Sequence, residues 1–199
     1  GVDPDFDGWV VALGALGIVT RVELEVEPTY DVAQTVFAGL DLDVVEDGFD
    51  AVFGAATSVS VFTRWRPEPD AQLWLKRRID REGVWPGGPA FGAAERTAPL
   101  HPLEQLDPVH CNPQLGQPGP WHERLPHFRA DFTPSAGDEI QAEYLLPRTH
   151  AVEAIRAIRT LHARITPLLH VTEIRTMRAD DLWLSPAYGV DTVGIHFTW

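Results

Sequence analysis

The sequence predicts an α+β domain with a mainly antiparallel sheet that is covered by helices. Its strand-like segments are grouped, rather than alternating one by one with helices as they would in a parallel α/β fold. Amphipathic spacing typical of helices is confined to two segments. The chain has 199 residues, 44% of them hydrophobic and 23% charged, so it can bury a core without disulfides.

The expected strands are recognised by apolar residues that recur at every second position, or by short β-branched and aromatic runs. In the first strand, Val22, Leu24 and Val26 alternate with charged residues, which predicts a half-buried strand. The two segments on either side of the loop at 66–70 are expected to form an antiparallel hairpin. The expected strands are residues 21–28, 32–40, 58–65, 72–79, 139–146, 169–177 and 192–199.

Two helices are expected. Residues 41–56 carry apolar residues at spacings of three and four, and Asp41 or Asp43 can cap the first turn. Residues 149–165 form the clearer helix, which Pro167 stops. Its apolar stripe is predicted to consist of Val152, Ile155, Leu161 and, at the third position, Ile158 or Arg159.

Residues 80–137 hold most of the proline and glycine and show no apolar period. A stretch of this length without regular structure is uncommon in a compact domain and is usually functional or mobile. We therefore expect a long irregular segment here, and it carries four of the histidines, His101, His110, His122 and His127.

Charge and composition exclude several classes of protein. The net charge is −13, and Lys76 is the only lysine, so a nucleic-acid or anionic-membrane partner is not expected. The longest apolar stretch, residues 9–20, is shorter than the roughly 20 residues of a spanning helix. Acidic residues precede it where a signal peptide has basic ones, so we expect a soluble, cytoplasmic protein.

The first candidate site is the pair Glu173 and Arg175. Residues two apart on a strand project from the same face, with Ile174 facing the other way. A carboxylate and a guanidinium side by side can accept from and donate to neighbouring hydroxyls of a polyol. The alternative from spacing alone is an ordinary ion pair on a solvated sheet, which contributes little stability.

His196 and Thr198 form the second candidate. They also share a strand face, and a neighbouring strand could align them with Glu173 and Arg175. The alternative is a pair of ordinary polar residues at a sheet edge.

Two histidine motifs are weaker candidates. His122 and His127 flank an acidic residue, but their spacing fits no zinc pattern and Pro126 prevents a helix, so loop packing is favoured over a metal site. His110 and Cys111 are adjacent and therefore poorly placed as a base and a nucleophile. No metal site is predicted.

Several motifs together resemble a known family. The stretch ALGALGIVT at residues 12–20 is similar to the closing segment of the FAD-binding domain in vanillyl-alcohol-oxidase-type flavoproteins. Downstream, the motifs SVSVFTRW, QLWLKRR, GQPGPWHERLPHF, QAEYLLPR, EIRT, DDLWLSPAYG and HFTW occur in the order typical of the alditol oxidase and xylitol oxidase group, in the sugar-1,4-lactone oxidase branch.

The resemblance implies an FAD-dependent oxidase that acts on the terminal carbon of a polyol. Hydride passes to the flavin, and O2 then reoxidises the flavin to give H2O2. Glu173 and Arg175 of EIRT and Thr198 of HFTW correspond to polyol-binding residues. The glycine-rich turn approaches the FAD, which makes Gly14, Gly17 and Ile18 candidate cofactor contacts.

The same resemblance implies a division of the chain. Residues 1–28 correspond to the closing segment of the FAD-binding domain and residues 29–199 to the substrate (cap) domain of a two-domain oxidase, incomplete at its C-terminus. The glycine-rich phosphate loop, the histidine that carries covalent flavin and the catalytic lysine lie outside the matched motifs. We therefore expect a fragment that is inactive alone.

Alternatives from the sequence are a sugar-1,4-lactone oxidase, which shares the scaffold, and a stand-alone polyol-binding or interaction domain. The surface that would face an FAD domain is expected to be apolar, which predicts self-association.

Overall fold

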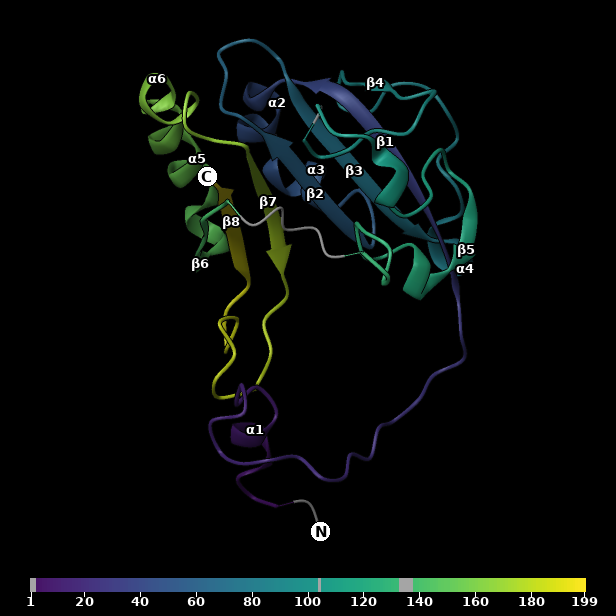
Figure 1. Ribbon diagram of the computed structural model, residues 1–199, viewed down its shortest axis with the longest axis vertical. Helices are drawn as coiled ribbons and strands as arrows, with labels where there is room; N and C mark the ends of the chain where they lie inside the picture. Colours follow the sequence, from purple (N-terminus) through teal and green to yellow (C-terminus); the bar gives the residue numbers. More distant parts are fainter. Residues whose placement is uncertain (1–2, 104, 133–137) are drawn as a thin grey trace.

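The computed structural model describes residues 3–103, 105–132 and 138–199. Figure 1 shows a single twisted sheet in which every pairing between strands is antiparallel. The strand order is β4-β1-β3-β2-β7-β8-β6, and β5 also pairs with β1. The strands are β1 (Asp31–Leu40), β2 (Ser58–Thr63), β3 (Ala71–Arg78), β4 (Ala94–Glu95), β5 (Pro118–Pro120), β6 (Gln141–Pro147), β7 (Val171–Met177) and β8 (Thr192–Thr198).

The helices are short. They are α1 (Phe6–Trp9), α2 (Leu42–Asp47), α3 (Phe49–Phe53), α4 (Ile79–Glu82), α5 (Ala151–Arg159) and α6 (His162–Ile165), with 3-10 turns at Pro108–His110, Trp121–Glu123 and Arg148–His150. Of the helices in the described part of the chain, none is long and apolar enough to cross a membrane. The antiparallel sheet with a few covering helices confirms the predicted α+β class.

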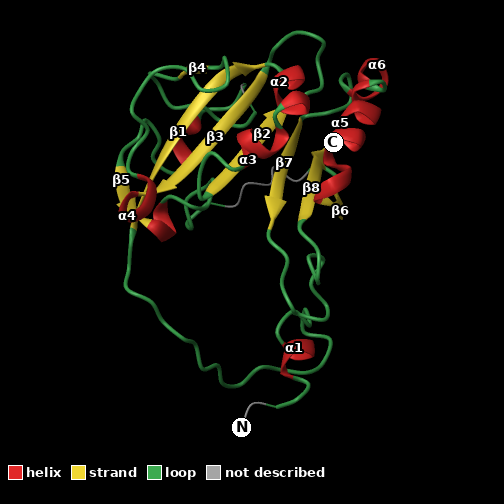
Figure 2. Ribbon diagram, turned by 180° about the vertical axis from the view of Figure 1, so that it is seen from behind, coloured by secondary structure: helices red, strands yellow, loops and turns green. Residues whose placement is uncertain are grey.

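One face of the sheet packs against α2, α3 and α5, which lie in front of it in Figure 2. Val45, Phe49 and Ile155 from these helices join strand residues such as Phe37 and Ile174 in the main hydrophobic core. Val45, Phe37, Ile155 and Ile174 are completely buried. Burial of these side chains removes apolar surface from water and is the main stabilising contribution of this layer.

The opposite face of the sheet is covered by loops from residues 80–132. A smaller apolar cluster lies beneath them, in which Phe62, Trp74 and Val171 of the sheet contact Cys111 and Phe128 of the loops. Beyond α4, only two very short strands and two 3-10 turns interrupt the described part of this segment. This confirms the predicted long irregular segment, of which residues 104 and 133–137 lie outside the described residues.

Both predicted helices are divided. The helix expected over residues 41–56 breaks at Gly48, whose φ of −133° is not helical, so α2 and α3 replace it. Asp41 caps α2 as expected, since its Oδ1 accepts from the Asp43 amide at 2.9 Å.

The helix expected over residues 149–165 ends at Arg159. The Thr160 hydroxyl donates to the Ala157 carbonyl at 2.7 Å, and the Leu161 amide donates to Ile158 in a 3-10 pattern at 2.8 Å. As a result Leu161 lies beyond α5 and is 43% exposed, so it is not part of the buried stripe.

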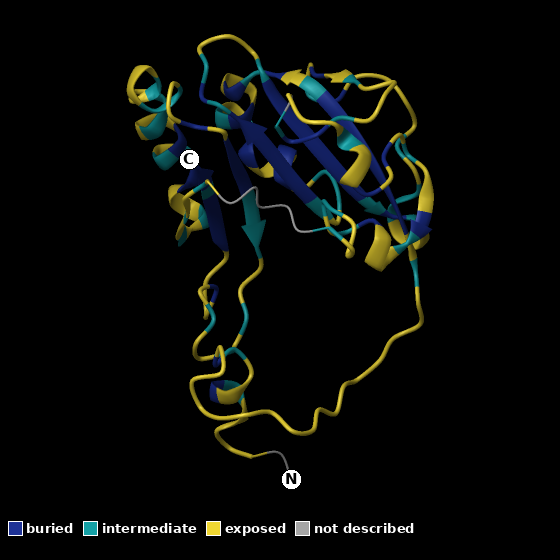
Figure 3. Cartoon of the chain, viewed as in Figure 1, coloured by how far each residue is buried: buried dark blue, intermediate teal, exposed yellow. Residues whose placement is uncertain are grey.

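The strand predicted over residues 21–28 is wrong. These residues have no regular structure, and Val22, Leu24 and Val26 are 62%, 79% and 91% exposed. A strand needs a neighbour to accept and donate its backbone hydrogen bonds, and within the described residues no segment lies beside this one. Figure 3 shows it as an exposed arm between α1 and β1.

The start of the arm is held by the β7–β8 loop, residues 178–191. The Trp183 amide donates to the Asp7 carbonyl at 3.1 Å, and the Trp183 ring lies against Gly8 so closely that a Cβ there would be 2.9 Å from it. The DDLWLSPAYG motif therefore anchors the N-terminal helix. The other predicted strands are confirmed, with ends that shift by a few residues.

We predict that limited trypsin digestion cleaves after Arg21 before it cleaves at arginines of the sheet. The Arg21 side chain is 80% exposed on a segment without backbone partners, whereas Arg78 lies in β3 and is buried. N-terminal sequencing should find Val22 first, with the far-UV circular dichroism of the sheet retained. Arg21→Gln should remove the early product, and an initial cut at Arg78 would contradict the structure.

Candidate functional site

The register of the sheet gathers polar side chains on the face that the loops cover. Glu173 of β7 pairs with Phe62 of β2 and with His196 of β8, and Val171 pairs with Thr198. Directly opposed residues of neighbouring strands share a face. The predicted alignment of His196 and Thr198 with Glu173 and Arg175 is therefore confirmed, and Ile174 faces the opposite core.

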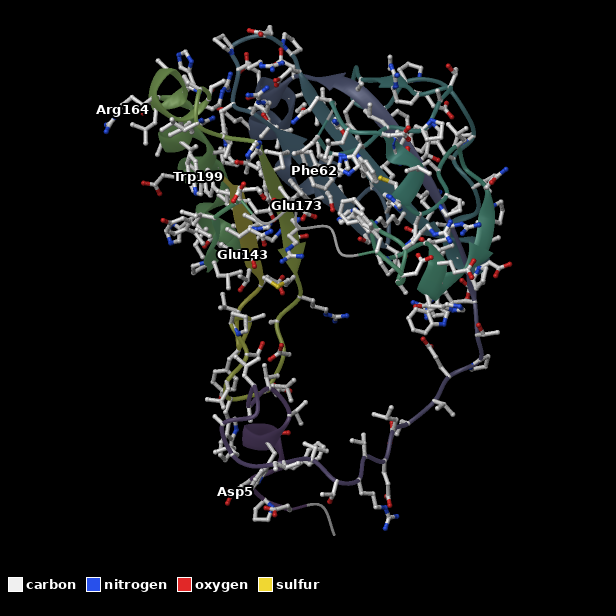
Figure 4. The ribbon with its side chains drawn as sticks, in the orientation of Figure 1. Asp5, Phe62, Glu143, Arg164, Glu173 and Trp199 are labelled. Carbon is white, nitrogen blue, oxygen red and sulfur yellow. The ribbon has the colours of Figure 1, made fainter. Side chains whose placement is uncertain are left out.

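A cavity of about 520 Å³ opens on this face. Glu173 and Thr198, both 8% exposed, are part of its wall, together with His196. Figure 4 shows Phe62 and Glu173 close together at the middle of the sheet. The remaining lining comes from the loops and from the ends of the neighbouring strands, and includes His101, Leu103, Gln105, His127, Phe128, Gln141 and His170.

The two oxygens of the Glu173 carboxylate are in different environments. Oε1 accepts from the Ser60 hydroxyl at 2.8 Å and contacts Nε2 of His127 at 3.0 Å. Oε2 has no hydrogen-bond donor among the described residues. A carboxylate oxygen can accept two hydrogen bonds or more, so Oε1 is well satisfied while Oε2 remains available to a ligand.

Glu173 is ionised at neutral pH despite its burial. Burial alone would raise the pKa of this carboxyl, but the hydrogen bonds with His127 and Ser60 and the charge of the Arg175 guanidinium outweigh it and lower the pKa to about 2. The site therefore presents a negatively charged acceptor inside a largely apolar cavity, where such an acceptor forms strong hydrogen bonds.

His127 and Lys76 are site residues that the sequence reasoning missed. His127 was expected to pack within its loop, and it does lie edge-on to the rings of Phe62 and Trp74, but it also contacts Glu173. Its Nδ1 is 3.1 Å from Nζ of Lys76, which also donates to the Leu125 carbonyl. Among the described residues no group of histidine, cysteine and acidic side chains could hold a metal ion.

A sequence signal existed for Lys76 but not for His127. Lys76 is the only lysine and follows an apolar run on β3, where it is 1% exposed. Burial lowers the pKa of its ammonium group to about 7, and the charge of Glu173 opposes that effect in part. By contrast, the position of His127 depends on the path of an irregular loop, which has no period that could place it.

Arg175 lies outside the cavity wall and pairs with a different acid from the one expected. Its Nη2 and Nε lie 2.7 and 3.1 Å from Oε1 of Glu143 on β6. Glu173, the neighbour two residues away, is not its ion-pair partner among the described salt bridges. The simple local ion pair between Glu173 and Arg175 is therefore not formed, and three of the five guanidinium N–H groups of Arg175 remain for other acceptors.

None of the expected cofactor contacts lines this cavity. Gly14 and Gly17 have φ values of +76° and +140°, which favour glycine, but a Cβ at either position would meet nothing within 4 Å. Ile18 is 94% exposed. Within the described residues these three positions do not form a cradle for a flavin.

The single cysteine is not a nucleophile in this structure. Cys111 is buried, and burial followed by the charge of Asp107 raises the pKa of its thiol to about 11. His110 stacks on Phe132 with ring centroids 4.1 Å apart rather than contacting the thiol. This agrees with the sequence expectation that His110 and Cys111 are poorly placed as a catalytic pair.

Comparison with known proteins confirms the resemblance that the motifs indicate. An alditol oxidase from Streptomyces sp. strain IKD472 is 48% identical over 194 residues, which is 98% of this chain and 45% of the relative. The chain thus spans about half the length of the curated relative. No family model matches it.

We predict that Glu173→Gln reduces the acid sensitivity of the fold. The pKa of Glu173 is about 2 in the folded state against an ordinary value of 4.5, so its stabilisation is present above pH 4.5 and is lost as the pH falls toward 2. A shift of this size corresponds to roughly 3 kcal/mol. Urea unfolding of the wild type and of Glu173→Gln should therefore show a difference in the free energy of unfolding that becomes smaller from pH 5 to pH 3.

Glu153→Gln is the matched control, because the Glu153 side chain is 84% exposed on α5. Its stability relative to the wild type should not change in the same way. A constant difference between wild type and Glu173→Gln over this pH range would show that Glu173 is not held as a carboxylate.

Proposed function

Because nearly the whole chain is related to an alditol oxidase, we propose that it supplies the polyol-binding part of an FAD-dependent oxidase. In the proposed reaction a terminal CH2–OH group of a polyol such as xylitol is oxidised to the aldehyde, and O2 is reduced to H2O2. Residues 29–199 are assigned to the substrate domain. Residues 1–28 are assigned to the closing segment of an FAD-binding domain.

The observation that carries the proposal is the free Oε2 of an ionised, buried Glu173 in the cavity wall. Each hydroxyl of a polyol is a donor and an acceptor, so one hydroxyl can donate to Oε2. The Thr198 hydroxyl in the same wall can bind a neighbouring oxygen. A buried charged acceptor that is left without a hydrogen-bond donor costs binding free energy. The site should therefore favour ligands that provide a hydroxyl over ligands that do not.

Arg175 is assigned to a further substrate hydroxyl. Glu143 occupies Nε and Nη2 of its guanidinium, and Nη1 has no hydrogen-bond acceptor among the described residues. Its side chain is 43% exposed, so this edge of the guanidinium is accessible. Two hydrogen bonds to the same oxygen of Glu143 restrain the orientation of the guanidinium, which reduces the entropy lost when it binds a ligand.

The oxidation also needs an electron acceptor, which in this proposal is FAD held mainly by other parts of the complete protein. The described residues are assigned only to binding and orienting the polyol. The exposed apolar side chains of the arm, including Ile18 and Val26, are consistent with a surface that another domain or a second copy covers.

We predict that the chain binds xylitol and that Glu173→Gln weakens this binding at least tenfold. The substitution keeps the shape of the side chain but removes its charge, and a hydrogen bond to a charged group contributes about 1.5–3 kcal/mol. Isothermal titration calorimetry at pH 7 would measure both affinities. Glu153→Gln should bind as the wild type does, and equal affinity in Glu173→Gln would remove Glu173 from the site.

We also predict the reaction class. With added FAD and xylitol the chain should produce no H2O2, because Gly14, Gly17 and Ile18 form no flavin cradle in it. A chimera in which the chain replaces the matched 194 residues of the Streptomyces alditol oxidase should produce H2O2 from polyols, once its flavin absorbance confirms loading. A preference for 1,4-lactones in that assay would instead support a sugar-lactone oxidase.

A further inference from the structure

A buried hydrogen-bond chain connects three separate parts of the fold on the cavity side of the sheet. It runs from Nζ of Lys76 on β3 to Nδ1 of His127 in the loop, over 3.1 Å, and from Nε2 of His127 to Oε1 of Glu173 on β7, over 3.0 Å. Lys76 has no role in the proposed polyol contacts, and His127 contacts Oε1 of Glu173 rather than the Oε2 assigned to the polyol.

The hydrogen bonds between Lys76, His127 and Glu173 restrict the protonation state of the His127 ring. A lysine ammonium group can only donate, so Nδ1 of His127 must accept and its proton must lie on Nε2, which then donates to Glu173. The opposite neutral tautomer would place N–H against ammonium and a lone pair against carboxylate. A doubly protonated ring would leave the ammonium without an acceptor on His127.

We propose that Lys76 and His127 are positioning residues that hold Glu173 as a carboxylate with Oε2 turned toward the substrate cavity. The substrate part of this statement rests on the proposed function, whereas the protonation pattern does not. Below the Lys76 pKa of about 7, one positive charge on Lys76 balances one negative charge on Glu173, and a neutral imidazole joins them. A buried charge is tolerated when it is paired and hydrogen-bonded in this way.

The surroundings of the imidazole support a fixed orientation. The rings of Phe62 and Trp74 contact His127 edge to face, with centroids 5.2 and 5.5 Å away. The Ser60 hydroxyl lies 3.4 Å from Nε2 and donates to the same Oε1. The ring therefore has little room to flip, and its Nε2–H is directed at Glu173.

The charges around His127 also favour a neutral ring. Burial lowers the pKa of His127 below its ordinary value, the cations Lys76 and Arg175 lower it further, and Glu173 opposes them. Lys76 faces the ring from β3, and Glu173 and Arg175 face it from β7. The net effect lowers the pKa of His127, which favours the neutral form of the ring.

The direct test is the protonation of the ring nitrogens in the purified chain, measured by two-bond proton–nitrogen correlation spectra at pH 6. His127 is assigned by the signal that disappears in His127→Gln. We expect a neutral ring that carries its proton on Nε2. A ring protonated on Nδ1, or on both nitrogens, would overturn the proposal.

A second test removes the cation. In Lys76→Met the ring no longer faces an ammonium group but still faces Glu173, so the pKa of His127 should rise by about one unit or more. Arg77→Met is the matched control, since Arg77 is adjacent in sequence but its guanidinium binds the carbonyls of Glu82 and Gly83. An unchanged pKa in folded Lys76→Met, or an equal rise in both variants, would contradict the role of Lys76.

The link to the substrate is tested by the pH dependence of xylitol affinity. In the wild type the affinity should be constant between pH 5 and pH 7, because Glu173 stays ionised. In His127→Gln it should weaken as the pH falls through this range, because the carboxylate has lost its imidazole donor. Identical profiles would overturn the positioning role, whereas a wild type that binds no polyol at all would refute the proposed function and leave the ring-nitrogen result standing.

Discussion

The buried carboxylate of Glu173 is the constraint on which the arrangement of the site depends. A charge in the interior is stable only with partners, and its partners here come from β2, from β3 through His127, and from the long loop. The strands and the loop must each be correctly placed for all of these hydrogen bonds to form together. Because Oε1 takes both donors, the arrangement fixes the orientation of the carboxylate and leaves one oxygen for a ligand.

The sheet separates the two tasks of the molecule. On one face, Ile174 and its neighbours pack against helices in the main hydrophobic core. On the other face, Glu173 is part of the cavity wall, and the rings of Phe62 and Trp74 flank the His127 ring that contacts it. Because successive side chains of a strand point to opposite faces, one strand can contribute apolar residues to the core and polar residues to the cavity side.

Much of the fold was predictable because its signals are local. The alternation in β7 and β8 correctly placed Glu173, His196 and Thr198 on one face. The segment at residues 21–28 has equally clear alternation, but it is not a strand in the structure. Alternation shows which side chains would share a face, and it does not show whether another strand lies alongside to form backbone hydrogen bonds. Apolar spacing likewise predicted both helical segments, but it does not show where the helices end. The backbone conformation of Gly48 ends one early, and the hydroxyl of Thr160 bonds to the backbone at the end of the other.

The sequence by itself determined the fold class, the family resemblance and the shared face of the candidate residues, since these follow from order and period along the chain. Only the tertiary structure decided which side chains meet. It paired Arg175 with Glu143 and brought Lys76 and His127 to Glu173. These partners are separated by tens of residues and by irregular loops, so their contacts depend on the path of the backbone in space, which no local pattern specifies.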